Sequence, residues 1–193
     1  MIPDSVKSIG NTAFKDCSSL LRVSIPESVT SIGTRAFEYC SSLSSVTIPD
    51  SIKSVGTDAF FGCSSLKSIE VGKGNTRYAS INGVFFDKKR KTTLIKFPAS
   101  KSGHYIIPDS VEIIGNFAFA SCNGLTSVNI GNGVTSIGDY AFKNCSRLKS
   151  VSISGSVTSI GRRRSTAAAV LQVPRYLTAS PALGFRPSVT AKV

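Results

Sequence analysis

Apolar residues return along this chain at a fixed interval of 23 residues. The most visible is a phenylalanine that directly follows an alanine, at Phe14, Phe37, Phe60, Phe119 and Phe142. A cysteine follows each of them three residues later, at Cys17, Cys40, Cys63, Cys122 and Cys145. The interval from Cys63 to Cys122 is 59 residues, so one of the two units that it spans carries 13 extra residues. Internal repetition of this length is typical of repeat architectures.

Each unit follows the pattern I-P-D-S-V-x-S-I-G-x-x-A-F-x-x-C-S-S-L-x-S-V-x-I. The stretch Leu-x-x-Val-x-Ile alternates apolar and polar positions, which predicts a strand with one buried face, and the proline after it ends that strand. Ser-Val-x-Ser-Ile predicts a second short extended segment, and the glycine after it allows a tight bend. Ala-Phe-x-x-Cys is too short for an independent helix, so we expect one helical or 3₁₀ turn whose Phe and Cys point inward.

One such unit cannot bury both of its apolar edges, whereas stacked units bury them against each other. The predicted fold is therefore a solenoid of 23-residue coils, with short parallel strands joined by turn or 3₁₀ segments. Because neighbouring strands lie about 4.8 Å apart, five or six coils would form a body on the order of 30 Å long.

This pattern resembles the BspA-type leucine-rich repeats, also called the Treponema pallidum type, over residues 2–161. The matching residues include Ile25-Pro26, Ile32-Gly33, Ala36-Phe37, Cys40 and Leu43, and they recur as far as Ile137-Gly138, Ala141-Phe142, Cys145 and Leu148. The resemblance implies a leucine-rich repeat solenoid that is displayed on the cell surface or secreted. It also implies attachment to host proteins, matrix or other cells, with no catalytic residues and no cofactor.

Residues 72–106 interrupt the period. Two apolar runs, Ser80–Phe86 and Thr93–Phe97, flank the charged segment Asp87–Lys91, which predicts a hairpin insertion with a charged turn. The sequence leaves open whether Leu94–Phe97 or Tyr105–Ile107 continues the main sheet.

The expected domains are a solenoid over residues 1–161 and a non-repeat tail over 162–193. The next Ala, Phe and Cys are due at 164, 165 and 168, where Arg164, Ser165 and Ala168 stand instead. Such an abrupt change favours a splice, frameshift or other junction, and a natural disordered tail is the alternative. The chain also opens inside a repeat, so we expect a fragment whose true ends lie elsewhere.

Charge is unevenly distributed along the chain, whose net charge is +12. The tail carries six basic residues and no acid: Arg162, Arg163, Arg164, Arg175, Arg186 and Lys192. The other residues carry 17 basic and 11 acidic side chains, a net charge of only +6. The repeat body is therefore only moderately basic, and we do not expect nucleic acid as its partner. No signal peptide is visible, and no apolar run approaches the roughly 18 residues that span a bilayer.

Catalytic and metal chemistry find little support in the sequence. The cysteines share one inward position per coil and are odd in number, so we expect a ladder of reduced, buried thiols rather than a disulfide framework. No C-x-x-C pair suggests a metal site. His104 lies in a segment expected to be a loop, without a patterned partner, and Gly72-Lys73-Gly74 is expected to be a turn after a strand.

The outward positions of the predicted Leu-x-x-Val-x-Ile strands form the candidate binding face. Its residues are Arg22, Ser24, Ser45, Thr47, Ser68, Glu70, Ser127, Asn129, Ser150 and Ser152. The face is polar and nearly free of the aromatic anchors that strong interfaces use. We expect weak binding that gains strength over many repeats, with a merely solvated sheet as the alternative.

The function predicted from these features is a non-catalytic protein-binding or adhesion scaffold of a surface-displayed or secreted protein. Its expected partner is a protein of a host, a matrix or another cell, and the uncapped ends of the solenoid could also mediate self-association. The alternative is an intracellular leucine-rich repeat protein that binds polyanions through Lys88–Lys91 or Arg162–Arg164. An affinity that collapses as the salt concentration rises would favour that alternative.

Overall fold

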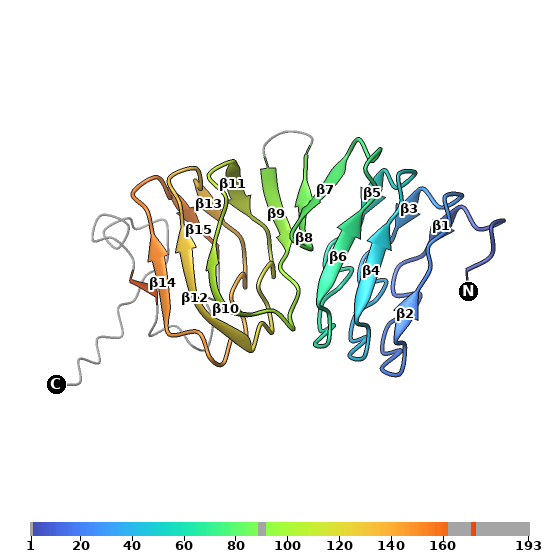
Figure 1. Cartoon of the computed structure of the whole chain (residues 1–193), viewed down its shortest axis with the longest axis horizontal. Coiled ribbons are helices and arrows are strands. Elements are labelled where there is room, and N and C mark those ends of the chain that lie inside the picture. The colour runs from blue at the N-terminus through green and yellow to red at the C-terminus, as the bar shows by residue number, and fades with distance from the viewer. Residues whose placement is uncertain (1, 89–91, 162–170, 173–193) are drawn as a thin grey trace.

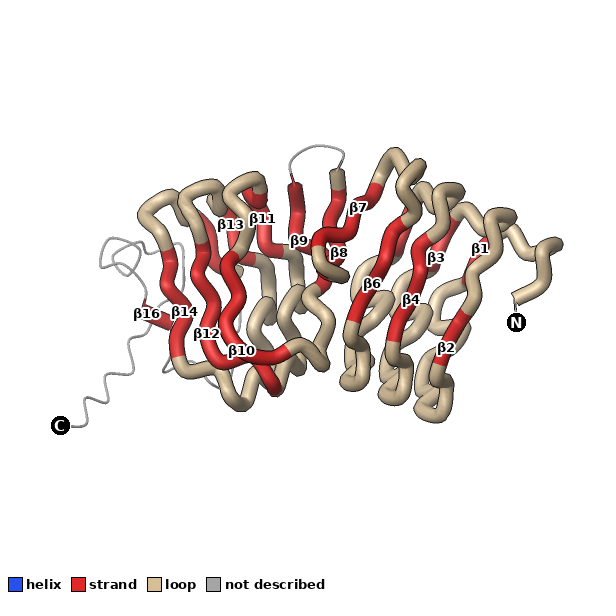
Figure 2. Tube along the Cα trace, viewed as in Figure 1, coloured by secondary structure: helices blue, strands red, loops and turns tan. Residues whose placement is uncertain are grey.

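The computed structural model describes residues 2–88, 92–161 and 171–172, which form a β-solenoid whose coils stack along the long axis of the molecule (Figure 1). Every regular element of this part of the chain is a β-strand, and the strands are joined by turns (Figure 2). A hairpin insertion divides the solenoid into a first array, residues 2–72, and a second array, residues 92–161. The predicted solenoid of parallel strands is confirmed.

The first array has two parallel sheets. The sheet of Leu-x-x-Val-x-Ile strands contains β2 (Arg22–Val23), β4 (Ser45–Ile48) and β6 (Ser68–Val71). The sheet of Ser-Ile strands contains β1 (Ser8–Ile9), β3 (Ser31–Ile32) and β5 (Ser54–Val55). Paired residues on neighbouring strands differ by 23 in number, so the period of the sequence is the period of the coil.

The second array repeats this arrangement. One sheet contains β10 (Ser102–Ile106), β12 (Gly124–Ile130), β14 (Ser150–Ile153) and β16 (Leu171–Gln172). The parallel part of the other contains β9 (Thr92–Lys96), β11 (Val111–Ile114), β13 (Ser136–Ile137) and β15 (Ser159–Ile160). Apart from β16, which pairs with β14, the predicted tail lies outside the described residues, and its boundary stays a prediction.

The Ala-Phe-x-x-Cys segments are turns, with neither an α-helix nor a 3₁₀ helix in the described chain. Each contains two left-handed residues four positions apart. The first stands before the alanine, at Thr12, Arg35, Asp58, Phe117 and Tyr140, and the second at Asp16, Tyr39, Gly62, Ser121 and Asn144. A residue at positive φ cannot continue a right-handed helix. Alternate backbone amides of each regular turn donate to the next coil, and the amides between them donate three residues back within their own turn.

Stacked phenylalanines run through the core of each array. The ring centroids of Phe37 lie 5.1 Å from Phe14 and 5.6 Å from Phe60, and those of Phe119 and Phe142 are 4.9 Å apart. The two cores form separate clusters of buried residues. The alternation of each short strand supplies the aliphatic part of these clusters, as the sequence predicts.

The insertion contains β7 (Tyr78–Ile81) and β8 (Val84–Asp87), and β8 pairs antiparallel with both β7 and β9. The predicted hairpin is therefore confirmed as β8–β9. A second hairpin, β7–β8, turns at Asn82-Gly83, where both residues have positive φ. The prediction of one continuous run from Ser80 to Phe86 missed this turn, although Asn-Gly is the strongest short hairpin signal.

The question of which segment continues the main sheet now has an answer. β10 pairs in parallel with β12 and joins the sheet of Leu-x-x-Val-x-Ile strands, whereas β9 pairs in parallel with β11 and joins the sheet of Ser-Ile strands. Both runs thus belong to one junction coil, defined as residues 92–106, at the start of the second array.

Strand β8 has both of its faces buried. Val84 and Phe86 point into the core of the second array, while Phe85 lies in the core of the first array with its ring 5.1 Å from that of Tyr78. A strand whose successive side chains enter two different cores needs apolar residues at every position, which explains the run Val-Phe-Phe.

Candidate protein-binding face

The ten residues predicted for the binding face lie on the outer side of the sheets that contain β2, β4, β6, β12 and β14. Each is exposed or half-buried, and each strand's alternate residues point into a core. The register places them in rows across the strands: Arg22 with Ser45 and Ser68, Thr47 with Glu70, Ser127 with Ser150, and Asn129 with Ser152. Ser24 follows β2 directly and is exposed.

The insertion separates these residues into two patches. The first patch is Arg22, Ser24, Ser45, Thr47, Ser68 and Glu70, and the second is Ser127, Asn129, Ser150 and Ser152. The β7–β8 hairpin covers the edge of β6, because Ile69 N donates to Gly83 O at 2.9 Å and Val71 N donates to Ser80 Oγ at 3.1 Å. The face is therefore not one continuous sheet.

Strand β10 adds two residues to the second patch that the sequence prediction missed. His104 pairs with Ser127, and its Nδ1 lies 2.7 Å from Ser127 Oγ; Ile106 pairs with Asn129 and is 61% exposed. The expectation that His104 lies in a loop is wrong. The available signal was the apolar run Tyr105–Ile107, but a strand of five residues outside the repeat period depends on its neighbour β12 for stability.

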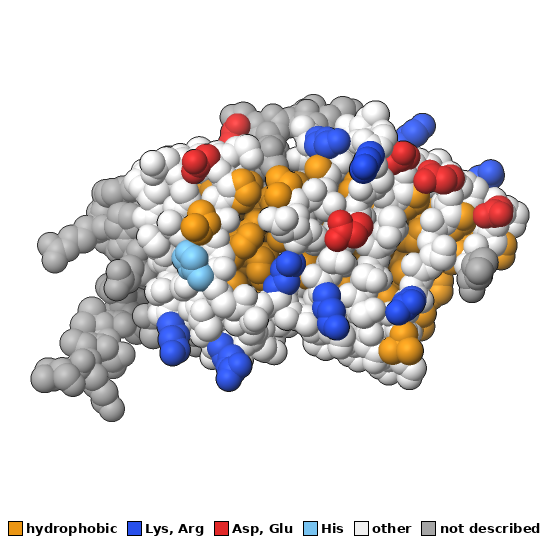
Figure 3. All heavy atoms as spheres, viewed as in Figure 1, with side chains coloured by type: hydrophobic (Ala, Val, Ile, Leu, Met, Phe, Trp, Pro, Cys, Tyr) orange, Lys and Arg blue, Asp and Glu red, His pale blue; other side chains and the backbone are white. Residues whose placement is uncertain are grey.

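Figure 3 shows this face of the molecule, with both signs of charge present and no extended field of one sign. Lys and Arg side chains lie along both its upper and its lower edge, and hydrophobic side chains gather where the two arrays meet. The exposed aliphatic residues Ile81 and Ile106 belong to strands beside this junction. Lys88, from the predicted basic segment, donates its ammonium to Asn75 O at 3.1 Å, and residues 89–91 lie outside the described residues.

A second surface feature, an aromatic strip, follows the turns. It consists of Tyr39, Phe61, Phe117 and Tyr140, whose successive ring centroids are 5.5, 5.2 and 4.9 Å apart. Lys143 places its ammonium 5.9 Å from the Phe61 ring and 5.4 Å from the Tyr140 ring. These aromatics occupy three different positions of the repeat, so periodicity alone could not reveal that they meet.

The thiols lie in the core except for the first. Cys40, Cys63, Cys122 and Cys145 are buried, and Cys40 Sγ donates to Phe14 O at 3.0 Å. Burial raises the pKa of Cys40 to about 11 and that of Cys63 to about 12, so both remain protonated thiols at neutral pH. Cys17 is exposed, which corrects the expectation that every thiol of the ladder is buried, because among the described residues no coil is stacked before its own.

Neither a metal site nor a membrane helix is found among the residues that the structure describes. No three His, Cys, Asp or Glu side chains in residues 2–88, 92–161 and 171–172 gather where they could bind a metal ion. In the same ranges, no helix has the length and apolar character needed to cross a bilayer.

Comparison with known proteins assigns the family. The model of the BspA type leucine rich repeat region, in 6 copies, matches residues 1–104 and 96–165. A solved structure of a leucine rich cell surface protein from Faecalibacterium prausnitzii A2-165 is 34% identical, covers 81% of this chain and has a TM-score of 0.75. The pneumococcal vaccine antigen PcpA is 25% identical over 81% of this chain, with a TM-score of 0.69.

A leucine-rich repeat protein from Eubacterium ventriosum is 26% identical over 80% of this chain, with a TM-score of 0.60. The matched part is 41% of the Faecalibacterium chain, 50% of PcpA and 53% of the Eubacterium chain, so this chain spans about half the length of these relatives. No curated protein sequence matches it. On the match to its repeats, the chain belongs to the BspA-type leucine-rich repeat family.

Proposed function

We propose that this chain is a non-catalytic protein-binding scaffold of a surface-displayed or secreted protein, and that it binds through its two strand-face patches. The observation that carries the proposal is the register of the outward residues, which form rows across neighbouring strands of a rigid sheet. The similarity to a protein described as a leucine rich cell surface protein supports surface display.

Small side chains in rows allow a partner's backbone to approach the sheet closely. Serines lose little side-chain entropy on binding, and the strands beneath them are held by backbone hydrogen bonds and a packed core. The exposed Ile106 gives the second patch an apolar contact that none of the six residues of the first patch offers, and His104 adds an imidazole. We therefore expect the second patch to contribute more to affinity than the first.

The contact between His104 and Ser127 does not support hydrolytic chemistry. Both side chains lie on an open sheet face, and within the described chain the other imidazole nitrogen has no hydrogen-bonded carboxylate to orient it. A nucleophile of this kind needs such an orienting group and donors for the developing oxyanion. We interpret the pair as a contact of the binding face.

Binding to immobilised fibronectin, laminin and collagen, measured by biolayer interferometry, tests this proposal. Ser45→Arg and Ser150→Arg place a large charged side chain on the first and second patch, respectively. Ser54→Arg is the matched control, because Ser54 is an exposed strand serine on the other sheet. We expect each patch variant to bind about tenfold more weakly while the control binds normally. Equal loss in all three variants, or no binding by the unaltered protein, would refute the proposal.

A further inference from the structure

Backbone hydrogen bonds between consecutive turns follow one rule throughout the regular coils. Three amides of each turn, two residues apart, donate to three carbonyls of the next turn, also two residues apart. In the second coil these bonds run from Arg35 N to Thr57 O, Phe37 N to Ala59 O, and Tyr39 N to Phe61 O, at 3.0, 2.8 and 2.8 Å. The first coil and the coil of Phe119 repeat the pattern.

The third coil, which contains Phe60, does not follow this pattern. Its equivalent amides, those of Asp58, Phe60 and Gly62, donate to no carbonyl or side chain of the described residues. The reason is the length of the next turn. Gly115 N donates to Leu94 O as Gly56 N donates to Ile32 O, so Leu94 corresponds to Ile32.

The junction coil is two residues short in its turn. Phe97 takes the place of Phe37, since Phe97 N donates to Ala118 O and its ring lies 5.1 Å from that of Phe119. Four residues separate Ile32 from Phe37, but only two separate Leu94 from Phe97. With two residues fewer, the carbonyls of this turn accept from none of the three amides of the third coil.

On the side of the second array, the Lys96 side chain compensates for the short turn. Its buried ammonium donates to Phe117 O at 3.2 Å and Ala120 O at 3.3 Å, and Ala120 O is a carbonyl that the turn amides of a full-length coil would reach. Burial lowers the pKa of Lys96, the cost of placing a cation in the core. The amides that face it across the gap receive no comparable partner.

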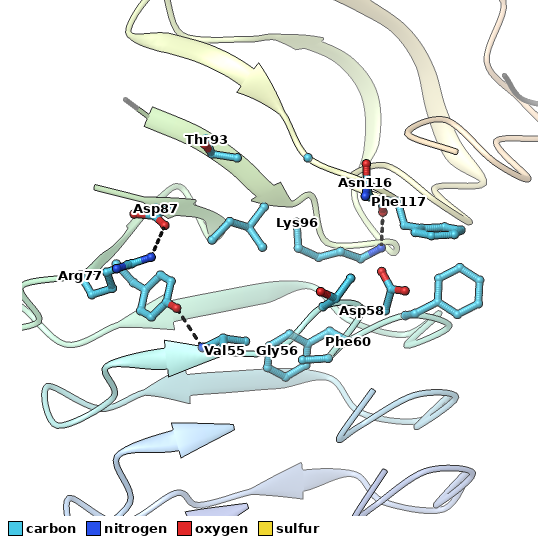
Figure 4. Close-up of a pocket in the computed structure, with 16 residues that line it drawn as sticks. Val55, Gly56, Asp58, Phe60, Arg77, Asp87, Thr93, Lys96, Asn116 and Phe117 are labelled. Carbon is cyan, nitrogen blue, oxygen red and sulfur yellow. Dashed lines mark hydrogen bonds and ion pairs between the residues drawn. The ribbon is translucent and has the colours of Figure 1, made fainter. Parts of the chain in front are cut away.

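The unfilled space is a hollow of about 290 Å³ between the two arrays (Figure 4). Asp58, Phe60 and Phe117 line it at one end, and Arg77 and Asp87 at the other. At about 30 Å³ for each water, this volume corresponds to about ten water molecules. The hollow thus has room for the two residues that the short turn lacks.

Two further polar atoms at the hollow are buried and have no hydrogen-bond partner among the described residues: Asp58 Oδ1, an acceptor, and Arg77 Nε, a donor. The Arg77 guanidinium is otherwise held by Asp87, at 3.1 Å. Burial raises the pKa of Asp58. Leaving such groups unpaired costs free energy that a ligand with complementary groups would recover.

We infer that this hollow binds a short peptide segment of a partner protein, which takes the place of the missing part of the turn. Carbonyls of the peptide, two residues apart, accept from the amides of Asp58 and Phe60, and an amide or ammonium group of the peptide donates to the Asp58 carboxylate. The bonding is that of peptides that extend a sheet edge. The site shares no residue with the strand-face patches, so either proposal can fail without the other.

An anion would satisfy the amides but would face the Asp58 carboxylate at the same point, and a cation would satisfy the carboxylate but not the amides. A peptide backbone carries both donors and acceptors at the required spacing. In a regular coil, the backbone of the next turn makes these bonds. The segment Gly33-Thr34-Arg35-Ala36 supplies Thr34 O and Ala36 O to the first coil in this way. It is therefore the natural probe for the hollow.

The test is titration of the full chain with acetyl-Gly-Thr-Arg-Ala-amide, followed by ¹H–¹⁵N NMR, with a scrambled peptide as control. A concentration of about 10 mM suffices for a Kd on the order of 1 mM, which so few contacts imply. We expect the amides of Asp58 and Phe60 and the Arg77 Nε–H to shift, and those of Arg35 and Phe37 to stay. Absence of these shifts, or equal shifts with both peptides, overturns the inference.

Two variants sharpen the test. Inserting Thr-Arg between Ile95 and Lys96 restores the turn to full length, fills the hollow and should abolish binding. Asp58→Asn removes the charge but keeps a residue that tolerates the φ of 59°, and should weaken binding about tenfold. Asp16→Asn, at a φ of 61° in a regular turn, is the matched control. If Asp58→Asn binds like Asp16→Asn, the peptide does not bind in the hollow.

Discussion

The two arrays are built from the same repeat but meet the insertion in different ways. The second array is joined to the insertion by backbone pairing. Its first strand, β9, pairs antiparallel with β8 of the insertion and in parallel with β11. The first array is joined to it largely by single contacts: Val55 N donates to Tyr78 Oη at 2.8 Å, and Val71 N donates to Ser80 Oγ.

This difference shows that the regular strand pairing of a solenoid can be interrupted at an insertion while the insertion still packs against the cores on both sides. The insertion acts as part of the second array by its backbone and as a cap of the first array by its side chains. Asn75 is the central residue of that cap: it is buried, its Nδ2 donates to Pro49 O and Ile52 O, and its Oδ1 accepts from the amides of Arg77 and Tyr78. The weakest boundary should therefore lie between the hairpin and the first array.

The largest expected effect separates the two faces of β8. Phe85→Ala and Phe86→Ala should each lower the free energy of unfolding by about 3–5 kcal/mol, because both side chains are fully buried. Hydrogen exchange should show lost protection mainly in the first array for Phe85→Ala and mainly in the second for Phe86→Ala. Ser45→Ala, on the exposed face, should change neither the free energy of unfolding nor the hydrogen exchange of the two arrays. Identical exchange patterns for the two phenylalanine variants would mean that the arrays unfold as one unit.

A smaller loss is expected from the cap. Asn75→Ala leaves two carbonyls and two amides without their partner and should cost about 2–4 kcal/mol, measured by urea denaturation. The first array should become easier to unfold relative to the second, as seen by exchange of the β5 and β6 amides. A loss centred instead on β11 to β15 would contradict the role of Asn75 as the link to the first array.

The next effect isolates a single bond. Tyr78→Phe removes only the hydroxyl that accepts from Val55 N, so the expected cost is about 0.5–1.5 kcal/mol. The amide of Val55 should exchange faster in the variant, while that of Gly56, which donates to Ile32 O, should not. Unchanged exchange at Val55 would show that the hydroxyl is not its effective acceptor.

The last prediction involves no change in stability. It compares the reactivity of thiols at different depths in the first array. At pH 8 iodoacetamide should modify Cys17 first, because it is exposed. The thiolate is the reactive form, and pKa values raised from 9.0 to about 11 and about 12 lower the thiolate fraction about 100-fold for Cys40 and about 1,000-fold for Cys63. Mass spectrometry of the folded protein should find Cys17 alone modified. Equal labelling of Cys40 would contradict its burial.

Most of the fold could be predicted from the sequence, because in a solenoid each unit packs against its neighbours in the same way. The 23-residue period fixed which strands pair, and the alternation in Leu-x-x-Val-x-Ile fixed which side chains are buried. The ten face residues followed from the same alternation, and the structure places each of them on the outer side. Their role in binding remains a proposal.

What only the tertiary structure decided lies where the repeat is broken. The sequence contains the Asn82-Gly83 turn and the two residues missing before Phe97, but their consequences depend on which coil each segment stacks upon. The period does not reveal that β8 divides its side chains between two cores or that Lys96 replaces a backbone donor. Nor does it reveal that three amides of the third coil have no acceptor among the described residues. The physical reason is that periodicity encodes contacts between like residues, whereas the junction is made of contacts between unlike ones.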